Sequence, residues 1–226
     1  GKLDLHEVRK AKRAFSISTD LKECAKADIV IEAIQDEFEQ KADLFKALDG
    51  IVKPDSIIVT TTNTHALTLL AAETRLPERV VGLHFFNPAH IMRLVEVIQG
   101  ERTAQSVLDR AQNFVRKINK TPLLVQDTPG LIVNRIAQAY YGEALYLLDD
   151  ASLDVETINR LLEAAGFPMG PFKLIDFLGV DVTFEMTRSI FEATFQAAPY
   201  RPHPRYRRMI QSGRLGRKAG RGFYSQ

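Results

Sequence analysis

The sequence predicts an α/β domain, incomplete at its N-terminus, followed by an all-α C-terminal domain. In the first half, short apolar and β-branched runs alternate with segments of helical spacing, as in a mainly parallel sheet with helices on both faces. From Gly130 onward, strand signals disappear and apolar residues recur at helical spacing. The stretch DTPG at residues 127–130 favours a hinge, because Pro and Gly are costly inside a helix. We therefore expect one domain over residues 1–126 and a second over residues 127–226.

The expected elements follow from these patterns in chain order. The strands are predicted at residues 13–18, 28–34, 56–62, 79–84, 93–98 and 122–126. The helices are predicted at residues 38–51, 66–75 and 103–118 in the first domain, and at 131–149, 154–165, 173–197 and 203–212 in the second. In the helix over 38–51, the residues Phe38, Leu44, Phe45 and Leu48 are expected to form one apolar stripe.

A Rossmann-like sheet holds a dinucleotide through a strand, a Gly-rich turn and the N-terminus of a helix. The thirteen glycines of this chain form no G-x-G-x-x-G between a strand and a helix. Gly220 and Gly222 give only a G-x-G near the C-terminus, where too few residues follow to open a helix. The first recognisable strand therefore reads as a middle strand of the sheet, and we expect that an upstream segment is truncated or unrecorded.

The bulk composition excludes several classes of protein. Thirty Lys and Arg against 28 Asp and Glu give a net charge of +2, too balanced to indicate nucleic acid as a partner. No apolar run is long enough to span a bilayer, so no membrane partner is expected. The single cysteine, Cys24, excludes an internal disulfide and indicates a cytoplasmic protein. The sequence has no Cys/His cluster that predicts a metal site.

The strongest chemical signal is HFFNP at residues 84–88, where a strand ends. Ligands bind at the carboxyl ends of strands in open α/β sheets. Glu96 follows twelve residues after His84, so a turn of the chain could pair the two side chains. A histidine held by a carboxylate is suited to act as a general base near neutral pH. Taken alone, the same pattern also fits a buried structural histidine and a surface glutamate.

Six blocks in the same order give the sequence a specific resemblance to the L-3-hydroxyacyl-CoA dehydrogenase family. They are ADIVIEAI at 27–34, TNTHAL at 62–67, HFFNPAHIMRLVEVI at 84–98, DTPGLIVNR at 127–135, AGFPMGPFKLIDFLGVD at 165–181 and GRLGRKAGRGFY at 213–224. The blocks cover nearly the whole chain. The resemblance implies an oxidoreductase that interconverts L-3-hydroxyacyl-CoA and 3-ketoacyl-CoA with NAD(H).

The resemblance also implies roles for single residues. His84 would be the general acid/base that takes the proton of the substrate's 3-hydroxyl, and Glu96 would orient and stabilise its ring. Asn87 and Asn134 would bind substrate oxygens. No metal is implied.

Residues on the cofactor side follow from the same resemblance, with two departures. Asp36 stands where the family commonly has a glutamate near the nicotinamide ribose, and Lys41 matches a family lysine at the cofactor edge. Asn63 falls in the TNTHA stretch, where the family usually has S-N-T-S-S. His65 therefore replaces a serine that contacts nicotinamide and substrate. The alternatives without a role in binding are a helix-capping position for His65 and a solvated helix position for Lys41.

The basic C-terminal block alternates Arg and Gly, a pattern that also occurs in nucleic-acid-binding tails. In the family it closes the helical domain, so we expect Phe223 and Tyr224 to anchor it in an apolar seam and expect no nucleic-acid partner. Gly166 is expected to end the helix before it. The helical domain is the family's usual dimerisation surface, so a homodimer is expected.

Two other functions remain open at this stage. A catalytically inactive CoA-ester-binding or scaffold fragment would follow if the Gly-rich turn were truly missing. A different β-hydroxyacid dehydrogenase would use a lysine on a helix for catalysis, and would not need HFFNP followed by a glutamate. A sheet without its first strands would expose an edge and apolar faces, which favours the view that residues are unrecorded.

Overall fold

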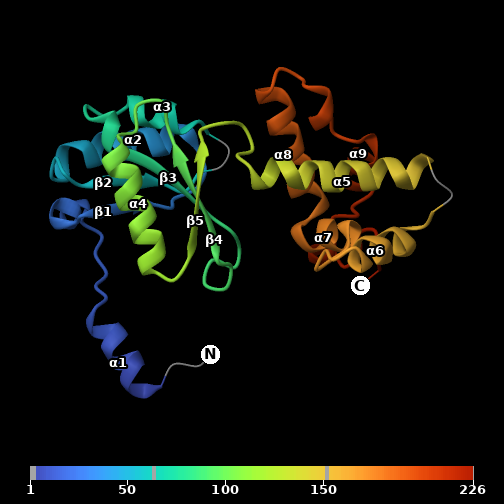
Figure 1. The fold of residues 1–226 in the computed structure, drawn as a ribbon, viewed down its shortest axis with the longest axis horizontal. Coiled ribbons are helices and arrows are strands. Elements are labelled where there is room, and N and C mark those ends of the chain that lie inside the picture. Colours follow the sequence, from blue (N-terminus) through green and yellow to red (C-terminus); the bar gives the residue numbers. More distant parts are fainter. Residues whose placement is uncertain (1–3, 63–64, 151–152, 226) are drawn as a thin grey trace. The chain divides into compact units, whose positions relative to one another are not determined.

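The computed structural model describes residues 4–62, 65–150 and 153–225 (Figure 1). The chain divides into two compact units, the first made of residues 1–62 and 67–123, while the second contains residues 124–226. The first is a Rossmann-like α/β unit and the second is helical. The predicted fold class is therefore confirmed, and the domain boundary that we place after residue 126 lies just beyond this division.

The first unit is built on a five-stranded sheet in the order β1-β2-β3-β4-β5. The strands are β1 (Ile29–Glu32), β2 (Ile57–Thr60), β3 (Val80–Phe85), β4 (Leu94–Gln99) and β5 (Thr121–Gln126). Strands β1, β2 and β3 are parallel, as expected, but β4 runs antiparallel to β3. The sheet is therefore mixed, because a short turn joins β3 to β4 where a parallel pair would need a crossover helix.

Three helices of this unit lie near the predicted ranges: α2 (Phe38–Ile51), α3 (Leu67–Ala72) and α4 (Gln105–Lys117). Helix α1 (Leu5–Arg13) was not predicted and lies away from the sheet in Figure 1. Two 3₁₀ turns, η1 (Leu21–Lys26) and η2 (Pro77–Arg79), complete the unit. Helix α4 buries Leu108 and Val115 against a cluster that includes Val59 and Leu83 of the strands. Burying side chains of this size contributes roughly 1.5–3 kcal/mol each.

The strand predicted at residues 13–18 is wrong. Helix α1 occupies residues 5–13, and residues 15–18 are not part of the sheet. Phe15 and Ile17 are 71% and 85% exposed. A β-branched, apolar run becomes a strand only where a neighbouring strand pairs with its backbone, and β1 is the first strand of the sheet that the structure describes.

The second unit consists of five helices among its described residues. They are α5 (Val133–Asp150), α6 (Val155–Ala164), α7 (Pro171–Leu178), α8 (Val180–Ala193) and α9 (Pro204–Gln211), with 3₁₀ turns η3 (Ala198–Tyr200) and η4 (Arg217–Ala219). Their core includes Leu145, Ile158, Phe172 and Tyr206. The segment predicted as helical over 173–197 is two helices, because Gly179 has a positive φ of 106° that breaks the α-helical path.

The C-terminal segment closes this unit as expected. The ring of Phe223 lies 4.7 Å from that of Phe172, measured between centroids. The buried carboxylate of Asp176 accepts hydrogen bonds from the backbone N–H groups of Phe223 and Tyr224, each at 2.9 Å. A Cβ atom on Gly222 would lie 2.0 Å from the Asp176 Oδ1 atom, so only glycine allows this approach.

Candidate functional site

The candidate catalytic pair lies on neighbouring strands of the first unit. His84 and Glu96 are direct partners in the antiparallel register of β3 and β4, which places both side chains on the same face of the sheet. The Nδ1 atom of His84 lies 2.8 Å from Oε2 of Glu96. The His84 side chain is 9% exposed and that of Glu96 is fully buried. The structure therefore brings together the two residues that the sequence paired.

This contact determines how the imidazole can act. A carboxylate only accepts hydrogen bonds, so the ring directs its Nδ1–H toward Glu96. In the neutral ring the lone pair is then on Nε2, and this nitrogen is the one that can take a proton. The ring is further restrained by Phe86, whose centroid lies 4.6 Å away. The arrangement can perform general acid/base chemistry with a single defined nitrogen.

The two asparagines predicted to bind substrate lie in different units. Asn87 follows β3 in the first unit, is exposed, and precedes a cis peptide bond to Pro88. Asn134 lies in the first turn of α5 in the second unit and is buried. Their predicted roles stay proposals.

A second polar cluster surrounds Lys41, at the carboxyl ends of β1 and β2. Lys41 is only 1% exposed, and its Nζ atom lies 2.6 Å from Glu32 Oε1 and 3.4 Å from Asp36 Oδ1. Glu32 also accepts hydrogen bonds from the hydroxyl of Thr60 at 2.7 Å and from the backbone N–H of Ile34 at 2.8 Å. Lys41 is therefore a buried, paired lysine, and the alternative of a solvated helix position is wrong.

Glu32 and Thr60 of this cluster were not predicted from the sequence. The signal was present, because Glu32 is the one charged residue in the apolar run IVIEAI and ends strand β1. A buried carboxylate needs hydrogen-bond donors or a cation, and Lys41 lies nine residues further along the chain. The cluster links β1, β2 and α2, with the exposed carboxylate of Asp36 at its outer side.

The remaining predicted positions lie in the loop after β2. His65 is half-buried and precedes α3. Asn63 lies outside the described residues. Within the described ranges, the structure contains no group of three or more His, Cys, Asp or Glu side chains that could hold a metal ion. No helix in the part of the chain that the structure describes is long and apolar enough to cross a membrane.

Two family models match the chain along almost its whole length. Residues 1–128 match the NAD binding domain of 3-hydroxyacyl-CoA dehydrogenase, and residues 130–226 match the C-terminal domain of the same family. The division between the two matches falls beside the Pro and Gly of the DTPG stretch.

Individual relatives and solved structures give the same result. The chain is 40% identical to a 3-hydroxyadipyl-CoA dehydrogenase of Escherichia coli, over 99% of this chain and 47% of that relative. It is 37% identical to a probable 3-hydroxybutyryl-CoA dehydrogenase of Bacillus subtilis, over 99% of this chain and 78% of the relative. The chain thus spans about half the length of the first of these relatives.

Among solved structures, a 3-hydroxybutyryl-CoA dehydrogenase of Escherichia coli superimposes with a TM-score of 0.96 at 40% identity. The match covers 100% of this chain and 48% of that structure. An (S)-3-hydroxybutyryl-CoA dehydrogenase of Ralstonia eutropha gives a TM-score of 0.94 at 33% identity, covering 99% of this chain and 79% of that structure.

Proposed function

The chain belongs to the 3-hydroxyacyl-CoA dehydrogenase family, and from this premise we propose that its protein interconverts L-3-hydroxyacyl-CoA and 3-ketoacyl-CoA with NAD(H). The observation that carries the proposal is the 2.8 Å contact between His84 and Glu96. Oxidation of a secondary alcohol needs a base for the hydroxyl proton, and a buried histidine oriented by a carboxylate meets that need.

In the proposed reaction, Nε2 of His84 takes the proton of the 3-hydroxyl group. Glu96 keeps the ring in place through Nδ1 and stabilises the positive charge that the ring acquires. NAD, when bound, supplies the acceptor for the hydride that leaves C3. In the reverse direction, the protonated His84 donates its Nε2 proton to the 3-keto oxygen. The side chains of Asn87, Asn134 and His65 are proposed to contact the substrate.

The Lys41 cluster fits the ribose end of the dinucleotide. Asp36 presents an exposed carboxylate at the carboxyl end of β1, where it can accept hydrogen bonds from ribose hydroxyls. Lys41 restrains that carboxylate, because its ammonium nitrogen lies 3.4 Å from Asp36 Oδ1. We therefore propose Asp36 and Lys41, with Asn63, as the cofactor-binding residues of this chain.

The alternatives are less well supported. An inactive CoA-ester-binding fragment would have no need for a buried, hydrogen-bonded His84 and Glu96, since an unused buried carboxylate is costly. A β-hydroxyacid dehydrogenase of the lysine-dependent type is disfavoured by the match of both halves to the 3-hydroxyacyl-CoA dehydrogenase family.

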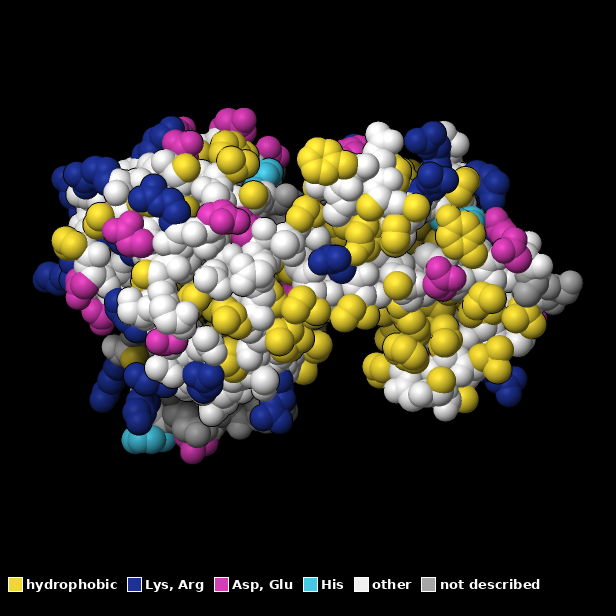
Figure 2. All heavy atoms as spheres, turned by 45° about the horizontal axis from the view of Figure 1, so that its top comes forward, with side chains coloured by type: hydrophobic (Ala, Val, Ile, Leu, Met, Phe, Trp, Pro, Cys, Tyr) yellow, Lys and Arg dark blue, Asp and Glu magenta, His cyan; other side chains and the backbone are white. Residues whose placement is uncertain are grey.

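We further propose a cytoplasmic homodimer that associates through the helical unit. Apolar side chains gather on the visible face of this unit (Figure 2). The large apolar side chains of the helical unit that are exposed by more than 40% include Ile136, Leu147, Leu161 and Phe177. Apolar patches of this kind are typical of protein–protein contacts. The free thiol of Cys24 suits a reducing compartment.

The proposed function is tested by His84→Ala in the full-length protein, with acetoacetyl-CoA reduction followed through NADH absorbance. We expect turnover to fall by roughly 10²–10⁴-fold, with the dissociation constant for the CoA ester nearly unchanged. His90→Ala, an exposed histidine six residues further along the chain, is the matched control and should retain full turnover. Unchanged turnover in His84→Ala would contradict the proposal.

A further inference from the structure

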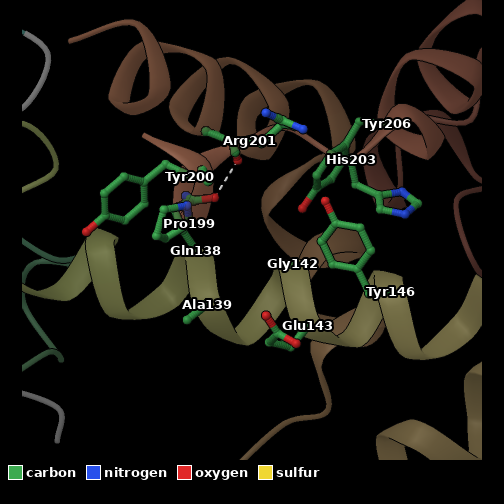
Figure 3. A pocket seen from close by; sticks show the side chains of 12 residues that line it. Gln138, Ala139, Gly142, Glu143, Tyr146, Pro199, Tyr200, Arg201, His203 and Tyr206 are labelled. Atoms are coloured by element: carbon green, nitrogen blue, oxygen red, sulfur yellow. Dashed lines mark hydrogen bonds between the residues drawn. The ribbon is translucent and has the colours of Figure 1, made fainter. Parts of the chain in front are cut away.

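A small pocket inside the helical unit is separate from every residue assigned above. Its volume is about 70 Å³, and it lies among α5, α8, η3 and α9 (Figure 3). Its walls include Gln138 and Tyr146 of α5, and Tyr206 of α9. Tyr146 and Tyr206 each bring a hydroxyl group to this wall. The pocket is therefore lined by hydrogen-bonding groups and not by aliphatic side chains alone.

Two of the buried polar groups in this wall are unsatisfied. Gln138 is 3% exposed and Tyr206 is 2% exposed. The Gln138 Nε2 atom and the Tyr206 hydroxyl have no hydrogen-bond partner among the described residues. The other end of the Gln138 amide is occupied, because its Oε1 atom accepts a hydrogen bond from Thr187. Leaving a buried polar group unpaired destabilises the fold, so two such groups in one pocket indicate that something binds between them.

Both groups are hydrogen-bond donors. The amide nitrogen of Gln138 carries two hydrogen atoms that it can donate, and it accepts no hydrogen bond. Burial raises the pKa of Tyr206, so its hydroxyl keeps its proton and can donate it. A ligand that satisfies both groups must accept hydrogen bonds.

The charge beside the pocket favours an anion. Arg201 lines both this pocket and an adjoining groove of about 640 Å³, which also contains Arg207. Neither guanidinium group has an ion-pair partner within the described ranges, whereas Arg188 of the same groove is paired with Glu192. Within the pocket wall Arg201 stands beside one acidic residue, Glu143, and Arg207 adds a second positive charge from the adjoining groove.

We propose that this pocket binds a small carboxylate, with its oxygens accepting hydrogen bonds from Gln138 and Tyr206 and its charge facing Arg201. The volume sets the size of the ligand. A water molecule needs roughly 10–15 Å³ on the same measure, so 70 Å³ accommodates about five or six non-hydrogen atoms. Acetate and propionate fit this limit and hexanoate exceeds it.

The site lies within the helical unit, among α5, α8, the η3 segment and α9, so its occupant stabilises the folded form of this unit. A ligand that binds only the folded state raises the unfolding temperature in proportion to the logarithm of its concentration. The test is calorimetric unfolding of the full-length protein in increasing sodium acetate, against sodium chloride at equal ionic strength. We expect a rise specific to acetate that grows with the logarithm of its concentration, a similar rise with propionate and none with hexanoate.

Two variants test whether the response to acetate comes from binding in this pocket. Tyr206→Phe removes a hydroxyl that has no partner in the described structure, so the variant should fold, and its apparent acetate affinity should fall at least tenfold. Arg201→Gln should lower the apparent affinity for acetate to a similar extent. Tyr140→Phe is the control, because that hydroxyl donates to the carbonyl of Met169 and does not line the pocket.

Equal unfolding temperatures in acetate and chloride would overturn the proposal and indicate that the pocket holds water alone. An unchanged acetate response in Tyr206→Phe would also overturn it, because the anion would then bind elsewhere. A crystal structure grown in acetate should show the carboxylate within hydrogen-bond distance of Gln138 Nε2 and the Tyr206 hydroxyl.

Discussion

His84 and Glu96 occupy directly opposed positions on two antiparallel strands, and their side chains meet at 2.8 Å between Nδ1 and Oε2. The register holds the pair on one face of the sheet, so neither side chain needs a loop to position it. Close approach of the two strands also depends on Gly82, where a Cβ atom would lie 2.7 Å from the Ile98 side chain. The geometry of the pair is thus a property of the strand pairing itself.

The Glu96→Gln variant distinguishes two roles of Glu96, orienting the ring of His84 and stabilising the positive charge on that ring. The amide oxygen of Gln can still accept the Nδ1–H bond of His84, but it carries no charge to stabilise the imidazolium. We expect turnover to fall by about 10–100-fold. The pH profile of alcohol oxidation should move to lower pH. Steady-state rates measured from pH 5 to 9 check both effects, with Glu101→Gln, an exposed residue just after β4, as the control. A profile that stayed in place would show that Glu96 does not act on the base.

Glu32 is predicted to position Lys41 and, through it, Asp36. In Glu32→Gln the Lys41 ammonium stays buried without its closest charge partner, so the free energy of unfolding should fall by about 3 kcal/mol. The loosened lysine should also raise the dissociation constant for NADH by about tenfold, equivalent to about 1.4 kcal/mol. Chemical unfolding and NADH fluorescence titration of the full-length protein measure the two quantities.

A double variant distinguishes positioning from a simple loss of stability. Glu32→Gln combined with Lys41→Met removes both charges, and such replacements are often neutral for stability. We expect the double variant to regain most of its unfolding free energy while NADH binding stays weak. If NADH binding recovered together with stability, Lys41 would have no role toward the cofactor. Glu39→Gln, exposed on the same helix α2, is the matched control.

The spacing of apolar and β-branched residues along the chain was sufficient to predict most helices and strands of the first unit. The helix over residues 38–51 has the bounds expected from its apolar stripe. The pairing of His84 with Glu96 followed from their spacing and from a turn between two β-branched runs. What the pattern could not show was strand partnership, because the run at residues 13–18 has strand composition but no neighbouring strand in the described structure.

The buried polar contacts were also beyond the sequence. Asp176 looks like an ordinary polar residue of an amphipathic helix, yet it is 2% exposed and binds the backbone of the C-terminal segment. Its partners lie 47 and 48 residues away in the sequence. Such long-range contacts depend on how helices pack, and helical spacing alone does not determine them.

Asp49 is predicted to make stability depend on acid pH. Its carboxylate accepts hydrogen bonds from Arg75 at 2.6 Å and from the buried Arg79 at 2.7 Å. Burial raises the pKa of Asp49, but the hydrogen bonds from Arg75 and Arg79 outweigh it and hold that pKa below its ordinary value. A carboxyl with a lowered folded-state pKa stabilises the fold above its unfolded pKa of about 3.9. That stabilisation is lost as the pH falls through the folded-state value.

Asp49→Asn should therefore lower the free energy of unfolding at pH 7 by about 3 kcal/mol, because it leaves Arg79 buried without its charge partner. The difference from the wild type should shrink as the pH falls from about 3.9, the pKa of the unfolded carboxyl, through the lower pKa of the folded state. Urea unfolding at several pH values measures this difference. Asp43→Asn, whose side chain is 84% exposed on the same helix, should show almost none. A difference for Asp49→Asn that stayed constant to pH 2.5 would contradict the assigned cause.

The contact between Asp176 and the C-terminal segment predicts a local effect. In Asp176→Asn, an amide N–H group replaces one of the two oxygens that accept the backbone N–H groups of Phe223 and Tyr224. One buried donor then loses its acceptor, at a cost of about 1–3 kcal/mol. Because the lost bond holds only the chain end, we expect that segment to open first. Limited trypsin digestion should cleave after Arg221 faster than in the wild type, while Glu185→Gln, exposed on α8, digests normally.

Gly222→Ala should have the same effect as Asp176→Asn, because its Cβ atom would displace the carboxylate from the other side. Normal digestion of both variants would mean that the aromatic contacts of Phe223 alone hold the segment.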